Sequence, residues 1–389
     1  MADLLFTNGF SYPCAMSARF STRRIVLYTL LAAAIIFAVT FDSCLMGRYF
    51  VYNFSDIGDH EKFDNRPLQK ADQPFQFKRG GNQNLAIRTG RGMQTLSQIN
   101  NDNDSRAFLV IRNDSILYEG YFKGYTDSNA VPSFSMAKSF TSALIGCAIA
   151  DGLIGSADDK VTKYLPDLKD PSWNQVSLRH LLNMTSGMDF DEGYYSPFTE
   201  AASFYYGRNL RERILDLKTK RPPGQQWEYV SGSTEMLGLV LERVLKGETI
   251  TAYLQRKIWT PLGMEFDAGW SIDDKKTGME KTFCCINARA RDYAKFGRLY
   301  LNKGQWEGKQ LVPENWVMES TKPGTAPGCD PQYHFQWWLR PNGAFLARGH
   351  LGQYIYVVRN KNLIFVRLGA SKGELDDWPG FFDILSKYY

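Results

Sequence analysis

The stretch SMAKSFTSALIGCAIADGLI, residues 135–154, predicts a long helix at the centre of the fold. Its large apolar side chains recur at helical spacing: Phe140, Leu144, Ile145, Ile149 and Leu153. The other faces of the helix are also apolar or small, which is typical of a helix buried at the centre of a domain. Gly152 and Gly155 predict its end. We therefore expect the other elements to pack around it.

Strand-like segments stand on both sides of this helix in the sequence. AFLVIRNDSILYEGYF (107–122) predicts a hairpin, and after Tyr333 the predicted strands are HFQWWLRP (334–341), AFLARGHLG (344–352), QYIYVVRN (353–360) and LIFVRLGA (363–370). Between them, helical patterns lie at 178–184, 234–245, 250–257 and 288–301, and a last one covers about 375–388. This order predicts an α+β fold in which strands from both ends form one antiparallel sheet flanked by helices, with a helical lobe inserted between them.

The N-terminal region predicts a membrane anchor. Residues 25–41, IVLYTLLAAAIIFAVTF, carry no charge and follow Arg23 and Arg24. At helical rise they span roughly 26 Å, near the lower limit for a bilayer. A cleaved signal peptide shares this pattern, but Phe41-Asp42-Ser43-Cys44 lacks the small residues of a cleavage site. We expect an uncleaved transmembrane helix with residues 1–24 in the cytoplasm, and secretion after cleavage is the alternative.

The remaining organisation follows from composition. Residues 55–105 are polar, so we interpret 42–104 as a linker or approach segment and 105–389 as the main domain. The net charge of +5 is spread along the chain, so nucleic acid is not an expected partner. With 4 His and no cysteine pair at zinc spacing, we expect neither a metal nor another cofactor. The sequence decides neither the oligomeric state nor the pairing of its main-domain cysteines, which are Cys147, Cys284, Cys285 and Cys329.

Ser135 and Lys138 form an S-x-x-K pair that occurs once in the chain. Residues three apart share one face of a helix, so the Lys138 amine can reach the Ser135 hydroxyl. A serine hydroxyl needs such a base to act as a nucleophile, and a lysine serves when burial lowers its pKa. The alternative is structural: Ser135 caps the helix and Lys138 faces solvent.

Two further stretches favour the catalytic interpretation. Tyr229-Val230-Ser231 follows a proline-glycine turn and precedes a helix, and His350-Leu351-Gly352 lies on a predicted strand. A tyrosine phenol can pass protons to a leaving atom. A glycine such as Gly352 lets a strand approach the site closely, where its backbone N–H can stabilise an oxyanion.

With SMAK (135–138), YVS (229–231) and HLG (350–352) in this order, the chain resembles the class C β-lactamase-related serine hydrolases. That family includes penicillin-binding carboxypeptidases, esterases and 6-aminohexanoate-dimer hydrolases. Supporting stretches are VSLRHLLNMTSGM (176–188) and NARARDYAKFGRLYLNKGQW (287–306), and the resemblance covers about 105–388. It implies a β-lactamase/transpeptidase-like fold and a small ester or amide as the substrate.

The resemblance also implies roles for the matched residues. Ser135 is the acylated nucleophile, and Lys138 and Tyr229 share the general-base and general-acid work. Ser231 hydrogen-bonds near Lys138. The backbone N–H groups of Ser135 and Gln353 form the oxyanion hole.

Other matched positions border the implied cleft. His350 lines the wall opposite Ser231, and DFDEGYYSPF (189–198) overhangs it, so that Tyr194 or Tyr195 binds substrate or assists the leaving group. Packing of these aromatics on the helical lobe is the alternative.

Two departures from the family pattern bear on the substrate. Ser231 stands where many relatives have asparagine, and His350 stands where a lysine helps to attract a carboxylate. Because histidine is largely neutral at pH 7, the sequence favours uncharged esters or amides over penicillins. The alternatives are a cell-wall D-amino-acid carboxypeptidase or penicillin-binding protein, and a non-catalytic binding protein of the same fold.

Overall fold

The computed structural model describes residues 21–40, 45–52 and 54–389. Its α-helices are α1 (Thr22–Thr40), α2 (Leu45–Tyr52), α3 (Asp59–Lys62), α4 (Leu96–Asp102), α5 (Ala137–Ala150), α6 (Leu178–Leu182), α7 (Glu200–Tyr206), α8 (Leu210–Leu215), α9 (Ser231–Leu245), α10 (Ile250–Leu254), α11 (Ala290–Leu301), α12 (Glu314–Ser320) and α13 (Trp378–Leu385). Most of the predicted helices form where their apolar spacing placed them, with ends shifted by a few residues.

The main sheet has eight strands in the order β12-β13-β14-β15-β16-β5-β6-β2. They are β2 (Lys78–Arg79), β5 (Ser105–Arg112), β6 (Ser115–Tyr121), β12 (Tyr333–His334), β13 (Trp337–Leu339), β14 (Phe345–Gly349), β15 (Gln353–Val358) and β16 (Leu363–Gly369). All neighbours are antiparallel except β2 and β6. Because β16 pairs with β5, strands from both ends of the main domain form one sheet, which confirms the predicted α+β architecture.

The hairpin between β5 and β6 turns at the residues that the sequence indicated. Asn113 and Asp114 have φ values of 49° and 58°. Two consecutive positive φ angles suit the right-handed twist of a two-residue hairpin, and Asn and Asp tolerate them better than most residues.

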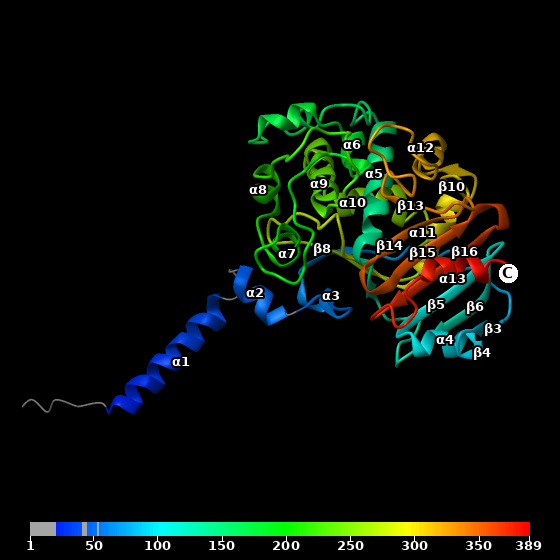
Figure 1. The fold of residues 1–389 in the computed structure, drawn as a ribbon, viewed down its shortest axis with the longest axis horizontal. Coiled ribbons are helices and arrows are strands. Elements are labelled where there is room, and N and C mark those ends of the chain that lie inside the picture. Colours follow the sequence, from blue (N-terminus) through cyan, green and yellow to red (C-terminus); the bar gives the residue numbers. More distant parts are fainter. Residues whose placement is uncertain (1–20, 41–44, 53) are drawn as a thin grey trace, which may run out of the picture.

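Each face of the main sheet has its own apolar core, as the period of two along a strand requires. On β5, Leu109 and Ile111 pack in the larger core, which also contains α5 and α11. Phe108 and Val110 point to the other face, where they pack with residues of α4 and α13. Figure 1 shows α4 and α13 on that face of the sheet and α5 between the sheet and the helical lobe.

Helix α5 is central, as its sequence predicted. Every residue from Ala137 to Ala148 is buried. The helix ends at Ala150, four residues earlier than the apolar pattern suggested, because Gly152 adopts a φ of 73°. Burial on all sides holds the first turn of α5 at a fixed place between the sheet and the lobe.

A second, smaller sheet joins the lobe to the start of the domain. Its strand order is β1 (Asn65–Leu68), β8 (Ala268–Ser271), β9 (Ile286–Ala288) and β7 (Val131–Pro132). Two further pairs, β3 (Ala86–Thr89) with β4 (Gly92–Thr95) and β10 (Gln305–Trp306) with β11 (Lys309–Gln310), are short hairpins. Since β7 ends just before Ser133, the smaller sheet fixes the chain that leads into α5.

The structure describes two helices of the N-terminal region, α1 and α2. Helix α1 covers most of the predicted anchor and projects away from the remaining elements (Figure 1), while residue 41 lies outside the described residues. Within the ranges that the structure describes, no helix is both long and apolar enough to cross a membrane. The membrane anchor therefore stays a prediction. The described part of the predicted linker at 42–104 forms α2, α3, β1 to β4 and α4. Its strand β1 pairs with β8 and β2 pairs with β6, so it joins both sheets.

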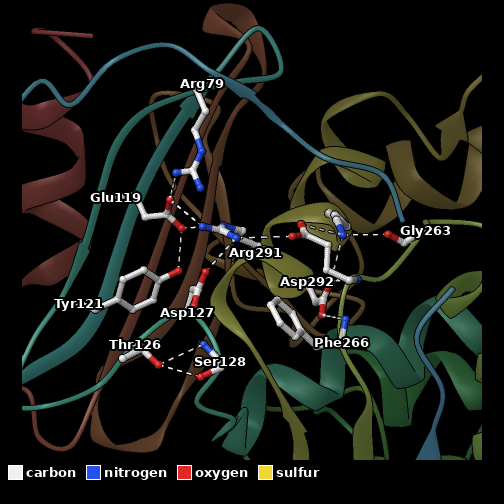
Figure 2. A network of polar contacts seen from close by, with 12 residues as sticks. Arg79, Glu119, Tyr121, Thr126, Asp127, Ser128, Gly263, Phe266, Arg291 and Asp292 are labelled. Carbon is white, nitrogen blue, oxygen red and sulfur yellow. Dashed lines mark hydrogen bonds and ion pairs between the residues drawn. The ribbon is translucent and has the colours of Figure 1, made fainter. Parts of the chain in front are cut away.

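A network of charged residues ties α11 to the main sheet (Figure 2). The guanidinium of Arg291 donates to both oxygens of Glu119 on β6, at 2.7 and 3.0 Å. One turn later, the buried Lys295 amine lies 3.0 Å from Asp292 and 3.1 Å from Glu265. Opposite charges thus meet where α11 crosses the sheet, which fixes the position of the helix.

Candidate active site

A cavity of about 310 Å³ opens beside the N-terminal end of α5. Three of its lining residues, Ser135, Tyr229 and His350, come from the three sequence motifs. The others are Ser55, Phe134, Glu192, Tyr194, Tyr205, Phe283, Cys284, Trp338, Arg348, Gly349 and Lys372. The fold therefore brings the motifs together from positions more than 200 residues apart.

Ser135 lies in a 3₁₀ turn, Phe134–Met136, that leads into α5. Phe134 has a φ of 43°, in the left-handed region that a bulky residue rarely adopts. Such an outlier persists only where the surrounding structure holds it, and outliers of this kind gather at active sites. Here the turn leaves the Ser135 side chain at the wall of the cavity.

Lys138, in the first turn of α5, has a 1% exposed side chain surrounded by oxygen acceptors. Its amine lies 3.1 Å from the Ser135 hydroxyl, 3.0 Å from the Ser231 hydroxyl and 2.9 Å from the Phe283 carbonyl. Burial lowers the pKa of Lys138 to about 8, although the carboxylates of Glu192 and Glu235 act in the opposite direction. The interpretation of Lys138 as a solvent-facing residue is therefore wrong.

Tyr229 precedes α9 and faces the same hydroxyl. Its side chain lines the same cavity as Ser135, and the Lys138 amine lies 5.1 Å from the centre of its ring. Burial, and then the charge of Glu192, raise the pKa of Tyr229, so the phenol keeps its proton near neutral pH. The ring stacks on Trp338 with a centroid distance of 5.9 Å, which fixes its direction.

Ser231 is the first residue of α9 and is fully buried. Besides its contact with Lys138, it donates to Glu192 through both its hydroxyl, at 2.5 Å, and its backbone N–H, at 2.6 Å. Burial raises the pKa of Glu192, while the Lys138 charge opposes that rise. Glu192 thus connects the helical lobe to the base at the site.

The strand β14 and the turn after it form the opposite wall. His350 meets Phe134 edge to face at 5.6 Å and stacks on Tyr194 at 6.5 Å. Burial, and then the charge of Lys372, lower the pKa of His350, so the imidazole is neutral at pH 7. A Cβ at Gly349 would lie 2.2 Å from the Ser133 carbonyl oxygen, so this close approach requires glycine.

Of the remaining predicted residues, Tyr194 lines the cavity, and Tyr195, Gln353 and Gly352 are not among its lining residues. Tyr194 lines the cavity and its hydroxyl lies 3.3 Å from that of Ser231, whereas Tyr195 is 79% exposed and does not line it. Gln353 begins β15 opposite Gly349, and its role in the oxyanion hole stays a prediction. Gly352 has a φ of 82° and its carbonyl accepts from Arg367, which indicates a structural role.

Sequence reasoning missed several contributors to the cavity. Glu192 lies in the stretch predicted to overhang the cleft, but nothing in its spacing connects it to Ser231. Phe283 contributes through its backbone carbonyl, which no sequence motif reveals. The adjacent Cys284 and Cys285 form a disulfide with each other, and Cys284 lines the cavity. Across the described ranges, no group of three or more His, Cys, Asp or Glu side chains is placed to hold a metal ion.

The comparisons with known proteins agree with this geometry. The 6-aminohexanoate-dimer hydrolase of Paenarthrobacter ureafaciens is 27% identical over 296 residues, which are 70% of this chain and 72% of that protein. A structure from Bacillus anthracis, provisionally named 6-aminohexanoate-dimer hydrolase, matches with a TM-score of 0.74 and 26% identity, over 84% of this chain and 90% of the other.

A family VIII carboxylesterase shares the fold, with a TM-score of 0.58 and 16% identity over 72% of this chain and 91% of its own. The family model described as Beta-lactamase matches residues 97–379, which include Ser135, Tyr229 and His350. The chain therefore belongs to the beta-lactamase family, whose fold it shares with amide and ester hydrolases.

Proposed function

We propose that this protein is a serine hydrolase that forms an acyl-enzyme at Ser135 and acts on esters or amides. The observation that carries the proposal is the position of the buried Lys138 amine, which lies between the hydroxyls of Ser135 and Ser231. The Ser135 side chain lines a cavity large enough for a small substrate.

Lys138 is the base of the first step. Because burial brings its pKa to about 8, a useful fraction of the amine is neutral near pH 7 to 8. The neutral amine takes the Ser135 proton as Oγ bonds to the substrate carbonyl carbon, and the carbonyl π electrons move onto its oxygen. The backbone N–H groups of Ser135 and Gln353 stabilise this oxyanion.

Tyr229 then supplies the proton for the leaving group. Its raised pKa keeps it a phenol, and its position on the cavity wall with Ser135 brings it to the reacting atoms. As the oxyanion collapses, the bond to the leaving nitrogen or oxygen breaks. That atom takes the phenol proton, and the tyrosine recovers a proton from Lys138. Water then attacks the acyl-enzyme by the same steps in reverse, releasing the acid and restoring Ser135.

The substrate class follows from the relatives and from the cavity walls. The relative named 6-aminohexanoate-dimer hydrolase supports an amide substrate, and a carboxylesterase with the same fold is compatible with esters. Aromatic rings of Phe134, Tyr205 and Trp338 line the cavity, which suits an apolar acyl or alkyl chain.

A cell-wall D-amino-acid carboxypeptidase is the second candidate, and one observation favours it. Arg348 and Lys372 both line the cavity, so positive charge is present although His350 replaces the lysine of the third motif. A substrate carboxylate could pair with these cations. Release of D-alanine from a pentapeptide distinguishes this activity from hydrolysis of uncharged esters.

The test is a panel of chromogenic esters, linear amides and β-lactams. We expect turnover of esters or amides by the wild type, and its loss in Ser135→Ala. Ser128→Ala, at an exposed serine, is the matched control and should retain the wild-type rate. Equal rates in Ser135→Ala and wild type would contradict the proposal.

A further inference from the structure

Part of the cavity lining comes from outside the family domain. Ser55 lines the cavity, although the family model begins only at residue 97. Ser55 belongs to residues 54–63, here called the N-terminal wall segment, which precedes β1 and includes α3. This segment therefore contributes one lining residue, Ser55, that the family domain does not supply.

Asp59 anchors this segment to the cavity. Its carboxylate is 1% exposed and accepts from the Tyr205 hydroxyl at 2.5 Å, from the Lys62 amine at 2.8 Å and from the Asp56 backbone at 3.0 Å. A buried carboxylate is costly unless donors surround it, and here one of the three donors is a tyrosine that lines the cavity. The bond fixes the end of the Tyr205 side chain.

The rest of Tyr205 is held from the same side. The Phe63 ring packs edge to face on the Tyr205 ring at 5.2 Å. The backbone carbonyl of Tyr205 accepts a hydrogen bond from the buried Lys281 amine. That amine lies 3.7 Å from the centre of the Phe63 ring. Tyr205 in turn meets Tyr194 edge to face at 6.2 Å, so the contacts reach the aromatic residues beside Ser231.

The exposed edge of the segment touches the overhanging loop as well. Phe54 contacts the ring of Tyr195 at 5.8 Å. The loop that carries Glu192 and Tyr194 is thus braced by residues before the family domain.

We propose that the N-terminal wall segment determines substrate specificity. Ser55 limits the length of chain that the cavity accepts, and Asp59 is a positioning residue that holds Tyr205 as part of the binding surface. The inference rests on the proposed hydrolase function and adds to it a determinant of substrate size. The substrates that this wall fits are esters or amides with a short apolar chain at the Ser55 end of the cavity.

The first test enlarges Ser55. Ser55→Trp is compared with the control Glu61→Trp on two ester series. The control places the same bulk at a side chain of the segment that is 80% exposed. One series lengthens the acyl chain and the other lengthens the alcohol. In Ser55→Trp, the ratio of kcat/KM for the longest to the shortest ester should fall by about tenfold in one series. The Glu61→Trp ratio should match the wild type. Equal ratios for both variants in both series would overturn the inference.

Binding measurements on an inactive variant distinguish a failure of this inference from a failure of the hydrolase proposal. The dissociation constant of the longest intact ester is measured on Ser135→Ala with and without Ser55→Trp. A wild type without turnover contradicts the hydrolase proposal, whereas equal dissociation constants contradict the specificity wall. Weaker binding with tryptophan supports the wall.

The second test removes the anchor. Asp59→Ala should raise KM for the longer esters by about tenfold, and more than it lowers kcat, because Tyr205 loses its acceptor. Asp59→Asn keeps an acceptor oxygen and should recover most of the wild-type KM. If Asp59→Ala does not fold, Tyr205→Phe deletes the same bond at nearly constant volume and should shift KM in the same direction. Equal KM values for wild type, Asp59→Ala and Tyr205→Phe would overturn the positioning role.

Discussion

The Lys138 amine and the Ser135 hydroxyl lie 3.1 Å apart at the first turn of a helix that is buried on all sides. The amine has two further acceptors, and its burial lowers its pKa to about 8. Close contact and a lowered pKa are the two conditions under which a lysine can activate a serine.

The pH dependence of acylation follows from this pKa. The neutral amine is the active form, so kcat/KM for an ester should rise with pH and level off above a midpoint near 8. The rate is low below the midpoint because the protonated amine cannot accept the Ser135 proton. Stopped-flow measurements of the acylation rate from about pH 6 to about pH 11.5 give this midpoint, after subtraction of the uncatalysed hydrolysis. A midpoint at the ordinary lysine value of roughly 10.4 would contradict the role of Lys138.

Glu192 should control that midpoint. Its carboxylate raises the pKa of Lys138, so Glu192→Gln should move the midpoint of kcat/KM to lower pH. Asp191→Asn, which removes a charge from the neighbouring exposed residue, is the control and should leave the midpoint in place. A shift to higher pH in Glu192→Gln would show that the carboxylate does not act on Lys138 in this way.

Gly349 should tolerate no side chain. An added Cβ would meet the Ser133 carbonyl oxygen at 2.2 Å, and Ser133 is itself held by hydrogen bonds to Ile286. Gly349→Ala should therefore displace the Ser135 turn and lower kcat by about 100-fold. Gly90→Ala, at an open position without a positive φ, is the comparison for general effects on stability. A wild-type kcat in Gly349→Ala would exclude this close packing.

The charged network around α11 should stabilise the fold without taking part in the chemistry. Arg291→Met leaves Glu119 without its bidentate partner and should lower the free energy of unfolding by about 3 kcal/mol. Lys70→Met removes an exposed cation and should have little effect. Urea unfolding measures the difference, and ester turnover per folded molecule should remain at the wild-type level. Equal unfolding midpoints for the two variants would count against the network.

Much of the fold could be predicted because its signals are local. The alternation along 107–122 and 344–370 indicated strands, and the all-round apolar surface of 135–154 indicated the central helix. The order of these elements then predicted one sheet formed from both ends, which the pairing of β16 with β5 confirms.

The site could be predicted only in part, because spacing reveals neighbours on one element and little else. Lys138 was found because it follows Ser135 by one helical turn. Glu192 and Ser55 reach the cavity through tertiary packing, and the Phe283 contact is made by a backbone atom. Tyr195 shows the converse, since it lies next to a cavity residue in the sequence but points to solvent.

Covalent labelling tests the central claim most directly. The wild type is treated with an activated fluorophosphonate, digested and analysed by mass spectrometry. We predict one adduct on the peptide that contains Ser135, a labelling rate that rises with pH through about 8, and no adduct in Ser135→Ala. A folded wild type that stays unlabelled, or that is labelled equally in Ser135→Ala, would contradict the assignment of Ser135 as the nucleophile.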